Sequence, residues 1–200
     1  MTDFIVATVE RGGAIGIFVL MLLENLFPPI PSELIMPLAG FVASRGQLGL
    51  TSVIVAGVAG SVIGTFFWYG LGRWLGEGSL RKFAARHGRW LTLSPEDVDR
   101  ANDWFIRHGA AALILGRLVP GVRTLISVPA GIFRVSPSYF LLLSTIGSAI
   151  WTTALAYAGF VFGSNYGAVT GVVEPIGTGI FVLAIAIYLY RVATFNTQGR

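Results

Sequence analysis

The stretch GRLVPGVRTLISVPAGIF, residues Gly116 to Phe133, combines features that membrane segments rarely carry together. It is mainly apolar and long enough to enter a bilayer, yet it holds two arginines, Arg117 and Arg123, with a proline and a glycine between them. Charge inside a membrane is expensive, so it usually marks a functional site. Proline and glycine interrupt helices, and freed backbone groups at membrane depth must be buried in protein or line a wet cavity. We interpret this stretch as a re-entrant hairpin.

The composition places the whole chain in a membrane. Of its 200 residues, 54% are hydrophobic and 12% are charged, whereas a soluble domain has about 25% charged residues. We expect a single membrane domain over residues 1–200, without room for a separate soluble catalytic domain. The basic residues form no stripe with interleaved aromatic residues, which argues against nucleic acid as a partner. Cysteine is absent and the two histidines lack metal-ligand spacing, so we expect neither a metal nor a cofactor.

Five apolar stretches follow one another along the chain. Three are long enough to span a bilayer, because about 20 residues suffice, and these are residues 48–71, 139–163 and 168–190. The other two, residues 14–41 and 110–133, are interrupted by proline, glycine and charge. The residues expected to break the helices are Pro28, Pro29, Pro31, Pro120, Gly121, Pro129 and Gly131. Two kinked spanning helices are the alternative interpretation, because proline and glycine are tolerated in transmembrane helices.

Residues 77–107 form the one polar stretch. It begins with basic residues and interleaved aromatic residues, which is typical of an amphipathic helix in the headgroup layer. Ser94 and Pro95, followed by acids, predict a helix start at Pro95. With Arg73, this linker holds seven Lys and Arg residues, so the positive-inside rule places it in the cytoplasm, and the C-terminus with it. A plain connecting loop followed by a solvated helix is the alternative.

The chain resembles itself at an offset of 91 residues. The matches fall on residues that determine backbone shape: Pro29 with Pro120, Leu34-Ile35 with Leu125-Ile126, Ala39-Gly40 with Ala130-Gly131, and Gly72 and Gly76 with Gly163 and Gly167. Each unit has one hairpin and one spanning helix, so the second unit starts on the opposite side of the membrane. We predict an inverted repeat, a recurrent transporter design. Unit one covers residues 14–76 and unit two 110–167, followed by a spanning helix at 168–190; chance matching in a glycine-rich chain is the alternative.

The predicted fold is therefore an all-α integral membrane protein with two re-entrant helical hairpins and about three spanning helices. The first hairpin carries two acids, Glu24 and Glu33, and the second carries Arg117 and Arg123. If the hairpins meet, the four charges share one site of low dielectric. Arginine binds phosphate or carboxylate through its planar fork of donors. A fixed ion-pair network without a substrate is the alternative.

The spanning helix at residues 48–71 and its continuation are rich in glycine. Small residues let helices approach closely. We expect Gly60, Gly64, Gly72 and Gly76 to pack against the hairpins, with association into a homodimer as the alternative.

Three motifs taken together resemble the DedA family of membrane proteins, which is related to the eukaryotic SNARE-associated, or VTT-domain, lipid scramblases. They are E-N-x-x-P-P-x-P-S-E (Glu24 to Glu33), G-x-x-x-G-x-x-x-x-Y-x-x-G-R-x-x-G (Gly60 to Gly76) and G-R-x-x-P-G-x-R-T with a following P-A-G (Gly116 to Gly131). The resemblance implies opposed re-entrant hairpins and movement of lipids across membranes. Bacterial members recycle undecaprenyl phosphate, or act on phosphatidylethanolamine, and depend on the proton or sodium gradient.

By this resemblance Glu24 and Glu33 match the functional acidic pair of the family, and Arg117 and Arg123 match its arginine pair. The second acidic position is often aspartate in the family. Glu33 stands there in this chain, which leaves the preference for protons or sodium open.

The leading hypothesis is a flippase of the cell membrane that moves a phosphate-bearing lipid, with undecaprenyl phosphate as the expected substrate. Arg117 and Arg123 would hold the phosphate, and Glu24 and Glu33 would couple transport to protons or sodium. The alternatives are a phospholipid scramblase, for example of phosphatidylethanolamine, and a proton-coupled ion or small-anion transporter. A structural membrane protein without a site is another. An enzyme that cleaves lipid phosphates is not expected, because the apolar segments hold no histidine and no recognisable pair of nucleophile and base.

Overall fold

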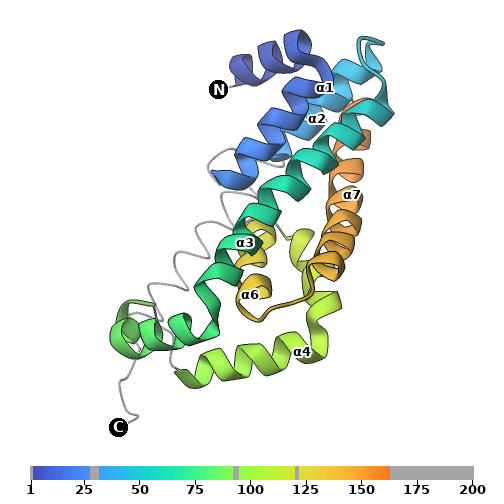
Figure 1. Cartoon of the computed structure of the whole chain (residues 1–200). Coiled ribbons are helices and arrows are strands. Elements are labelled where there is room, and N and C mark those ends of the chain that lie inside the picture. The colour runs from blue at the N-terminus through green and yellow to red at the C-terminus, as the bar shows by residue number, and fades with distance from the viewer. Residues whose placement is uncertain (1, 28–31, 92–94, 120–121, 163–200) are drawn as a thin grey trace.

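The computed structural model describes residues 2–27, 32–91, 95–119 and 122–162 of the chain (Figure 1). Within these ranges every regular element is a helix, which confirms the predicted all-α class. The helices are α1 (Thr2–Leu26), α2 (Ser32–Ser44), α3 (Leu50–Leu91), α4 (Pro95–Arg117), α5 (Val122–Leu125), α6 (Ser127–Ile132) and α7 (Pro137–Val161). The expected spanning helix at residues 168–190 lies outside the described residues, as do five of the expected helix breakers, Pro28, Pro29, Pro31, Pro120 and Gly121.

Two helices in the described ranges have the length and composition of membrane-spanning segments. They are Leu50–Ser79, the first 30 residues of α3, and the 25 residues of α7. Both exceed the roughly 20 residues that cross a bilayer, and both coincide with stretches that the sequence analysis assigned to spanning helices. Large apolar side chains on their outer faces are exposed, as a surface toward lipid requires, including Val55, Ile63, Phe67, Trp74, Leu142, Ile146 and Ile150.

The first helix is divided in two by Gly13. This residue has φ 54° and ψ −137°, a conformation that glycine adopts at little cost. The part of α1 after Gly13 and all of α2 have 13 residues each, or about 20 Å of helix at 1.5 Å per residue. A bilayer core is about 30 Å thick. These two neighbouring helices are therefore each too short to cross it.

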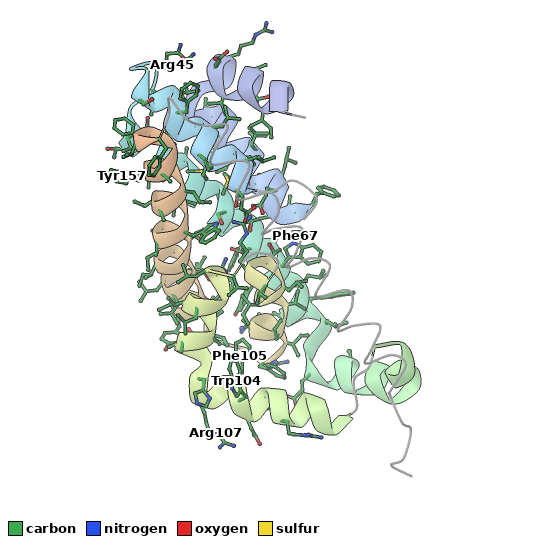
Figure 2. All side chains as sticks on the ribbon, turned by 180° about the vertical axis from the view of Figure 1, so that it is seen from behind. Arg45, Phe67, Trp104, Phe105, Arg107 and Tyr157 are labelled. Atoms are coloured by element: carbon green, nitrogen blue, oxygen red, sulfur yellow. The ribbon has the colours of Figure 1, made fainter. Side chains whose placement is uncertain are left out.

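The third helix changes direction at Gly76, whose φ of 69° is left-handed. The glycine-rich sequence of this helix predicts that Gly76 is a packing residue. The structure corrects that expectation, because a Cβ atom at Gly76 would have nothing within 4 Å. Beyond the bend, α3 continues to Leu91 at the end of the molecule where α4 lies crosswise (Figure 1). Figure 2 shows this end, marked by Arg107, opposite the end marked by Arg45.

The short helices α5 and α6 are separated by one residue, Ile126. Pro129 accounts for the separation, because its ring nitrogen cannot donate to the carbonyl four residues earlier. Gly131, which the sequence analysis also expected to break the helix, lies inside α6 and is buried. The structure corrects this second expectation: Gly131 is a packing residue. A Cβ atom there would overlap the backbone carbonyl oxygen of Tyr69 in α3.

A second contact between α3 and α6 has the same character. A Cβ atom at Gly72 would overlap the carbonyl oxygen of Val128. The two helices therefore touch backbone to backbone, which small residues allow. Gly60 and Gly64 make similar approaches to α1, where added Cβ atoms would overlap the Phe18 carbonyl oxygen and the Asn25 side chain.

The pair formed by α2 and α7 repeats this arrangement. A Cβ atom at Gly40 would overlap the carbonyl oxygen of Ala156, and one at Gly159 would overlap that of Pro37. Each contact residue of α6 follows its counterpart in α2 by 91 residues, and each contact residue of α7 follows its counterpart in α3 by 87 residues, so the counterpart of Gly72 by contact is Gly159 and not Gly163, as the constant offset of 91 predicts. The two helix pairs thus use the same contacts in the same order.

Two neighbouring glycines of α3 offer a matched test of this packing. We expect Gly72→Ala to lower the free energy of unfolding by about 1–3 kcal/mol, because the new methyl group overlaps the α6 backbone. A Cβ atom added at Gly70 would have nothing within 4 Å, so Gly70→Ala should raise stability by about 0.5–1 kcal/mol through helix propensity. The thermal unfolding midpoint in detergent measures both. Equal midpoints for the two variants would contradict the close contact.

Buried apolar residues form two clusters, one toward each end of the molecule. On α3, Val53 belongs to the first cluster and Tyr69 to the second. On α7, Ala156 belongs to the first and Phe140 to the second. The stretch between the clusters holds buried polar residues on both helices: Ser61 and Thr65 on α3, and Ser144, Ser148 and Thr152 on α7. A polar layer therefore crosses the middle of the helical core.

Candidate functional site

An ion pair between Glu24 and Arg123 lies in this polar layer. Arg123 donates from Nη2 to Oε1 of Glu24, across 99 residues of sequence. Glu24 is 3% exposed and Arg123 is 6% exposed, so both charges are withdrawn from solvent. Glu24 stands in the last turn of α1 and Arg123 in α5. The structure therefore joins one charge of each predicted hairpin.

A chain of polar side chains leads from this ion pair to α7. Asn25 donates from Nδ2 to Oε2 of Glu24 at 2.6 Å and to the Ser61 hydroxyl at 3.3 Å. Ser61 in turn lies 3.4 Å from the hydroxyl of Ser148. The carbonyl oxygen of Asn25 accepts from Trp68 Nε1 at 2.8 Å, which fixes the end of α1 against α3. The side-chain oxygen Oδ1 of Asn25 is buried without a hydrogen-bond partner.

Arg117, the last residue of α4, lies apart from this chain of polar groups. Its partner Ser144 stands one helical turn before Ser148 on α7. It is 2% exposed and donates from Nη2 to the hydroxyls of Ser144, at 2.7 Å, and Ser127, at 3.3 Å. Its guanidinium lies 5.5 Å from the ring centre of Phe140, within the range of a cation–π contact. Arg117 makes no ion pair with a carboxylate in the described ranges, and its Nε is buried without a hydrogen-bond partner.

Glu33, the second predicted acid, stands in the first turn of α2 and is partly buried. It makes no ion pair with any other residue that the structure describes. The four predicted charges thus do not form one closed network: Glu24 and Arg123 pair, while Arg117 and Glu33 have no partner of opposite charge among the residues that the structure describes. The roles given to these four residues stay predictions.

The hydroxyl groups around the charges were not singled out from the sequence. A usable signal does exist, because Ser61 and Thr65, and Ser144 and Ser148, stand four residues apart inside apolar spans and therefore share one face of each helix. Thr65 and Thr152 both return their hydroxyls to the carbonyl four residues earlier, at 2.9 and 2.8 Å. In the described part of the chain, no group of three or more His, Cys, Asp or Glu residues could hold a metal ion.

The helical core matches a known protein family. The model of the VTT domain matches residues 30–161. The chain belongs to the VTT-domain family. The match includes both membrane-length helices, the tight glycine contacts of α2 and α6, and the residues Glu33, Arg117 and Arg123. It begins after Glu24. The resemblance to the DedA family inferred from the three motifs is confirmed.

Several bacterial members of the VTT-domain family are similar over most of their length. The alkaline phosphatase-like protein of Lactococcus lactis subsp. lactis (strain IL1403) is 34% identical over 196 residues, 98% of this chain and 92% of that protein. Undecaprenyl phosphate transporter A of Staphylococcus aureus (strain NCTC 8325 / PS 47) is 33% identical over 190 residues, 95% of this chain and 94% of that protein. The protein of the same name from Bacillus subtilis (strain 168) is 32% identical over 158 residues, 79% and 78% of the two chains. No solved structure matches this VTT-domain chain.

Proposed function

We propose that this protein is a flippase that moves a phosphate-bearing lipid between the leaflets of the cell membrane, with undecaprenyl phosphate as the first candidate. The observation that carries the proposal is Arg117, a buried guanidinium bound by two hydroxyls and by no carboxylate of the described residues. The names of the Staphylococcus and Bacillus relatives support the choice of lipid.

Electrostatics explain why Arg117 favours an anion as its partner. Withdrawing one charge from water costs several kcal/mol even after the protein relaxes, and two hydroxyl dipoles offset only part of that cost. A phosphate group would supply the missing negative charge and accept from Nε, the donor that is left unused. The hydroxyls of Ser127 and Ser144 could then turn to donate to the phosphate, because hydroxyls both donate and accept. The isoprenoid tail would stay in the lipid.

The ion pair of Glu24 and Arg123 supplies the coupling in this proposal. While Glu24 is ionised it holds Arg123. A proton on Glu24 would release Arg123, which becomes a second cation for the lipid phosphate. Coupling needs such a difference in affinity between the two protonation states. Sodium bound near Glu24 or Glu33 would act in the same way, so the proton is the first candidate and sodium the second.

The proposed architecture is an inverted repeat of two re-entrant hairpins. It is supported by the repeated contacts of α6 on α3 and of α2 on α7, and by the contact of Ser61 with Ser148. These serines are counterparts by the same spacing of 87 residues, and counterparts touch one another only near a two-fold axis. The cytoplasmic side is assigned to residues 77–107 and the C-terminus from the basic residues of the linker, seven when Arg73 is included.

Transport by reconstituted protein tests the proposal. We expect liposomes that contain undecaprenyl phosphate and the protein to expose inner-leaflet lipid at the outer surface, where an added phosphatase releases its phosphate. An inward proton gradient should change the rate. Ser144→Ala should slow translocation about tenfold, because Arg117 loses its 2.7 Å hydroxyl partner. Thr145→Ala is the matched control, because Thr145 is exposed on the outer face and bonds only to the Leu141 carbonyl.

The same liposomes separate the other candidate functions. Phosphate release without the added phosphatase would favour a lipid phosphatase, the activity that the name of the Lactococcus relative suggests. Translocation of phosphatidylethanolamine at an equal rate would indicate a scramblase instead. Ion or phosphate flux in liposomes without the lipid would indicate an ion or small-anion transporter. Any of these results, without movement of undecaprenyl phosphate, would refute the proposed flippase.

A further inference from the structure

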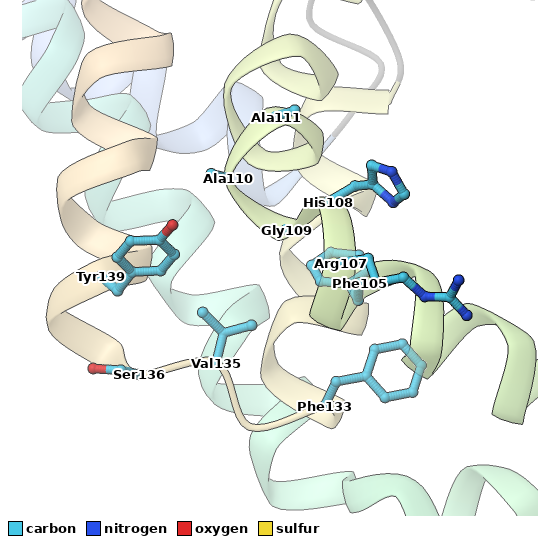
Figure 3. Close-up of a pocket in the computed structure, with 10 residues that line it drawn as sticks. All are labelled: Phe105, Arg107, His108, Gly109, Ala110, Ala111, Phe133, Val135, Ser136 and Tyr139. Atoms are coloured by element: carbon cyan, nitrogen blue, oxygen red, sulfur yellow. The ribbon is translucent and has the colours of Figure 1, made fainter.

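A surface cleft of about 500 Å³ lies apart from the buried charges, at the end of the molecule where α4 runs crosswise. Figure 3 shows α4 along one side of it, and the connection from α6 to α7 with the start of α7 along the other. Its apolar walls come from Phe105, Ala110, Phe133 and Val135. The run Gly109-Ala110-Ala111 leaves it open, because these three residues of α4 have no bulky side chain.

The rim of the cleft is polar and cationic. Arg107 and His108 come from α4, and Ser136 and Tyr139 come from the start of α7. Arg107 and His108 are exposed, so their donors are available at the surface. One acid, Asp103, stands a turn before Arg107 on α4 and is exposed. An apolar interior beneath a cationic rim suits an amphipathic anion.

Arg134, the residue between the cleft residues Phe133 and Val135, has a backbone conformation that costs energy. Its φ of 54° is left-handed, and it is the only non-glycine residue with positive φ in the described ranges. It ends α6, where Val135 N donates to Ala130 O and Arg134 N donates to Gly131 O, each at 3.0 Å. Glycine is the usual residue at this position of a helix end. An exposed arginine there, between the cleft residues Phe133 and Val135, indicates a use for its side chain.

The cleft and the site of Arg117 lie along the same helix, α7. Tyr139 at the cleft and Ser144 beside Arg117 are five residues apart on α7, or about 8 Å along the helix axis. Arg73 lies between the two sites: it donates to the Tyr69 hydroxyl at 2.8 Å and to the Val135 carbonyl at 3.4 Å. Tyr69 stacks on Phe140 with ring centres 4.4 Å apart, and Phe140 contacts Arg117.

We propose that this cleft is a docking site for the phosphate headgroup of a lipid in the cytoplasmic leaflet, separate from the buried site at Arg117. The first isoprene units or acyl carbons would lie against Phe105 and Phe133, and the phosphate would meet Arg107 and His108, with the exposed Arg134 as a neighbouring cation. The site rests on the function proposed above, because its occupant is the lipid that Arg117 then receives. The cleft would bind the lipid at the level of the cytoplasmic headgroups, about one and a half helical turns from the buried site at Arg117.

Binding of farnesyl phosphate, a soluble short-chain isoprenoid phosphate, tests the proposal on the full chain in detergent. The protein carries Arg117→Met in every arm, so that the cleft is measured without the inner site. Trp104 stacks on His108 with ring centres 5.5 Å apart, and its fluorescence should report occupancy. We expect Arg107→Gln to weaken binding about tenfold, as the loss of one charge-assisted hydrogen bond does, and Ala111→Leu to weaken it about tenfold because the larger side chain fills the cleft. Arg134→Gly removes a cation while relieving the strained backbone, and should weaken binding without loss of thermal stability.

The controls separate a lipid site from a simple anion site and from a general effect of charge. Arg45→Gln removes an exposed arginine at the opposite end and should leave binding unchanged. Farnesol should bind at least tenfold more weakly than farnesyl phosphate, and so should inorganic phosphate. Equal binding of inorganic phosphate would overturn the lipid assignment, and unchanged binding in both Arg107→Gln and Ala111→Leu would overturn the site. The proposed function can fail separately from the cleft. If the native chain shows no translocation but binding still depends on Arg107, the cleft is a lipid site on a protein that is not a flippase.

Discussion

Replacing Arg117 with methionine should abolish translocation of undecaprenyl phosphate while leaving the folded protein at least as stable as the native chain. Arg117 is buried, holds no carboxylate of the described residues and leaves one donor unused. Replacing buried charge by an apolar side chain of similar volume is often neutral or stabilising by about 1–4 kcal/mol. Transport and stability should therefore change independently, or in opposite directions. Translocation in the liposome assay and the thermal unfolding midpoint in detergent measure the two effects.

Arg117→Lys is the matched variant for this experiment. It keeps the charge but loses the planar fork that binds two phosphate oxygens together. We expect translocation between that of the native chain and that of Arg117→Met. A large fall in the unfolding midpoint of Arg117→Met, with normal translocation per folded molecule, would show that Arg117 is a structural residue and would remove the basis of the flippase proposal.

Neutralising either member of the Glu24–Arg123 pair should lower the free energy of unfolding, and neutralising both should recover most of the lost stability. Each single change, Glu24→Gln or Arg123→Gln, leaves the other charge buried without its partner, which typically costs about 3–5 kcal/mol. The double variant leaves no buried charge at this place. A double-mutant cycle from the four unfolding midpoints should therefore give a coupling energy of at least about 2 kcal/mol.

Transport by the same variants shows whether the Glu24–Arg123 pair couples transport to protons or is only a structural ion pair. Under the proposed coupling, Glu24→Gln mimics the protonated carboxyl, so translocation in the folded fraction should lose its response to a proton gradient. Arg45→Gln serves as the control at an exposed arginine outside the polar layer. A normal gradient response in Glu24→Gln would assign the coupling to another acid, of which Glu33 is the nearest candidate in sequence.

The sequence predicted which segments form membrane helices better than it predicted where those helices bend and touch. Uninterrupted apolar stretches predict membrane helices because length and hydropathy are properties of the segment alone, and α3 and α7 followed that pattern. Gly76 and Gly131 were misassigned because a glycine can pack, bend or break a helix, and the choice depends on the neighbour it meets. Gly131 meets the backbone of α3, whereas Gly76 meets nothing.

The candidate site was likewise only partly predictable from the sequence. Intramembrane charges stand out in any sequence, so Glu24, Glu33, Arg117 and Arg123 could be selected as candidates. Which acid faces which arginine depends on the depth at which the two chain segments meet, and only Glu24 and Arg123 form an ion pair in the described ranges. Ser127 and Ser144 were passed over because a serine in an apolar helix commonly satisfies itself on the preceding turn. Their bonds to Arg117 depend on packing between distant segments.

The backbone contacts of the glycines join α1 and α6 to α3, and α2 to α7, which defines two bodies, each with helices from both halves of the chain. Helix α4 joins α7 through a looser contact, because Gly147 of α7 meets mainly the side chain of Arg117. Contacts made by main chain leave no rotamers to adjust, so they tolerate little movement within a body. Arg117 reaches across the border, with Ser144 on its own body and Ser127 on the other. A small tilt between the bodies would therefore stretch the longer of these bonds, the one to Ser127, before the one to Ser144.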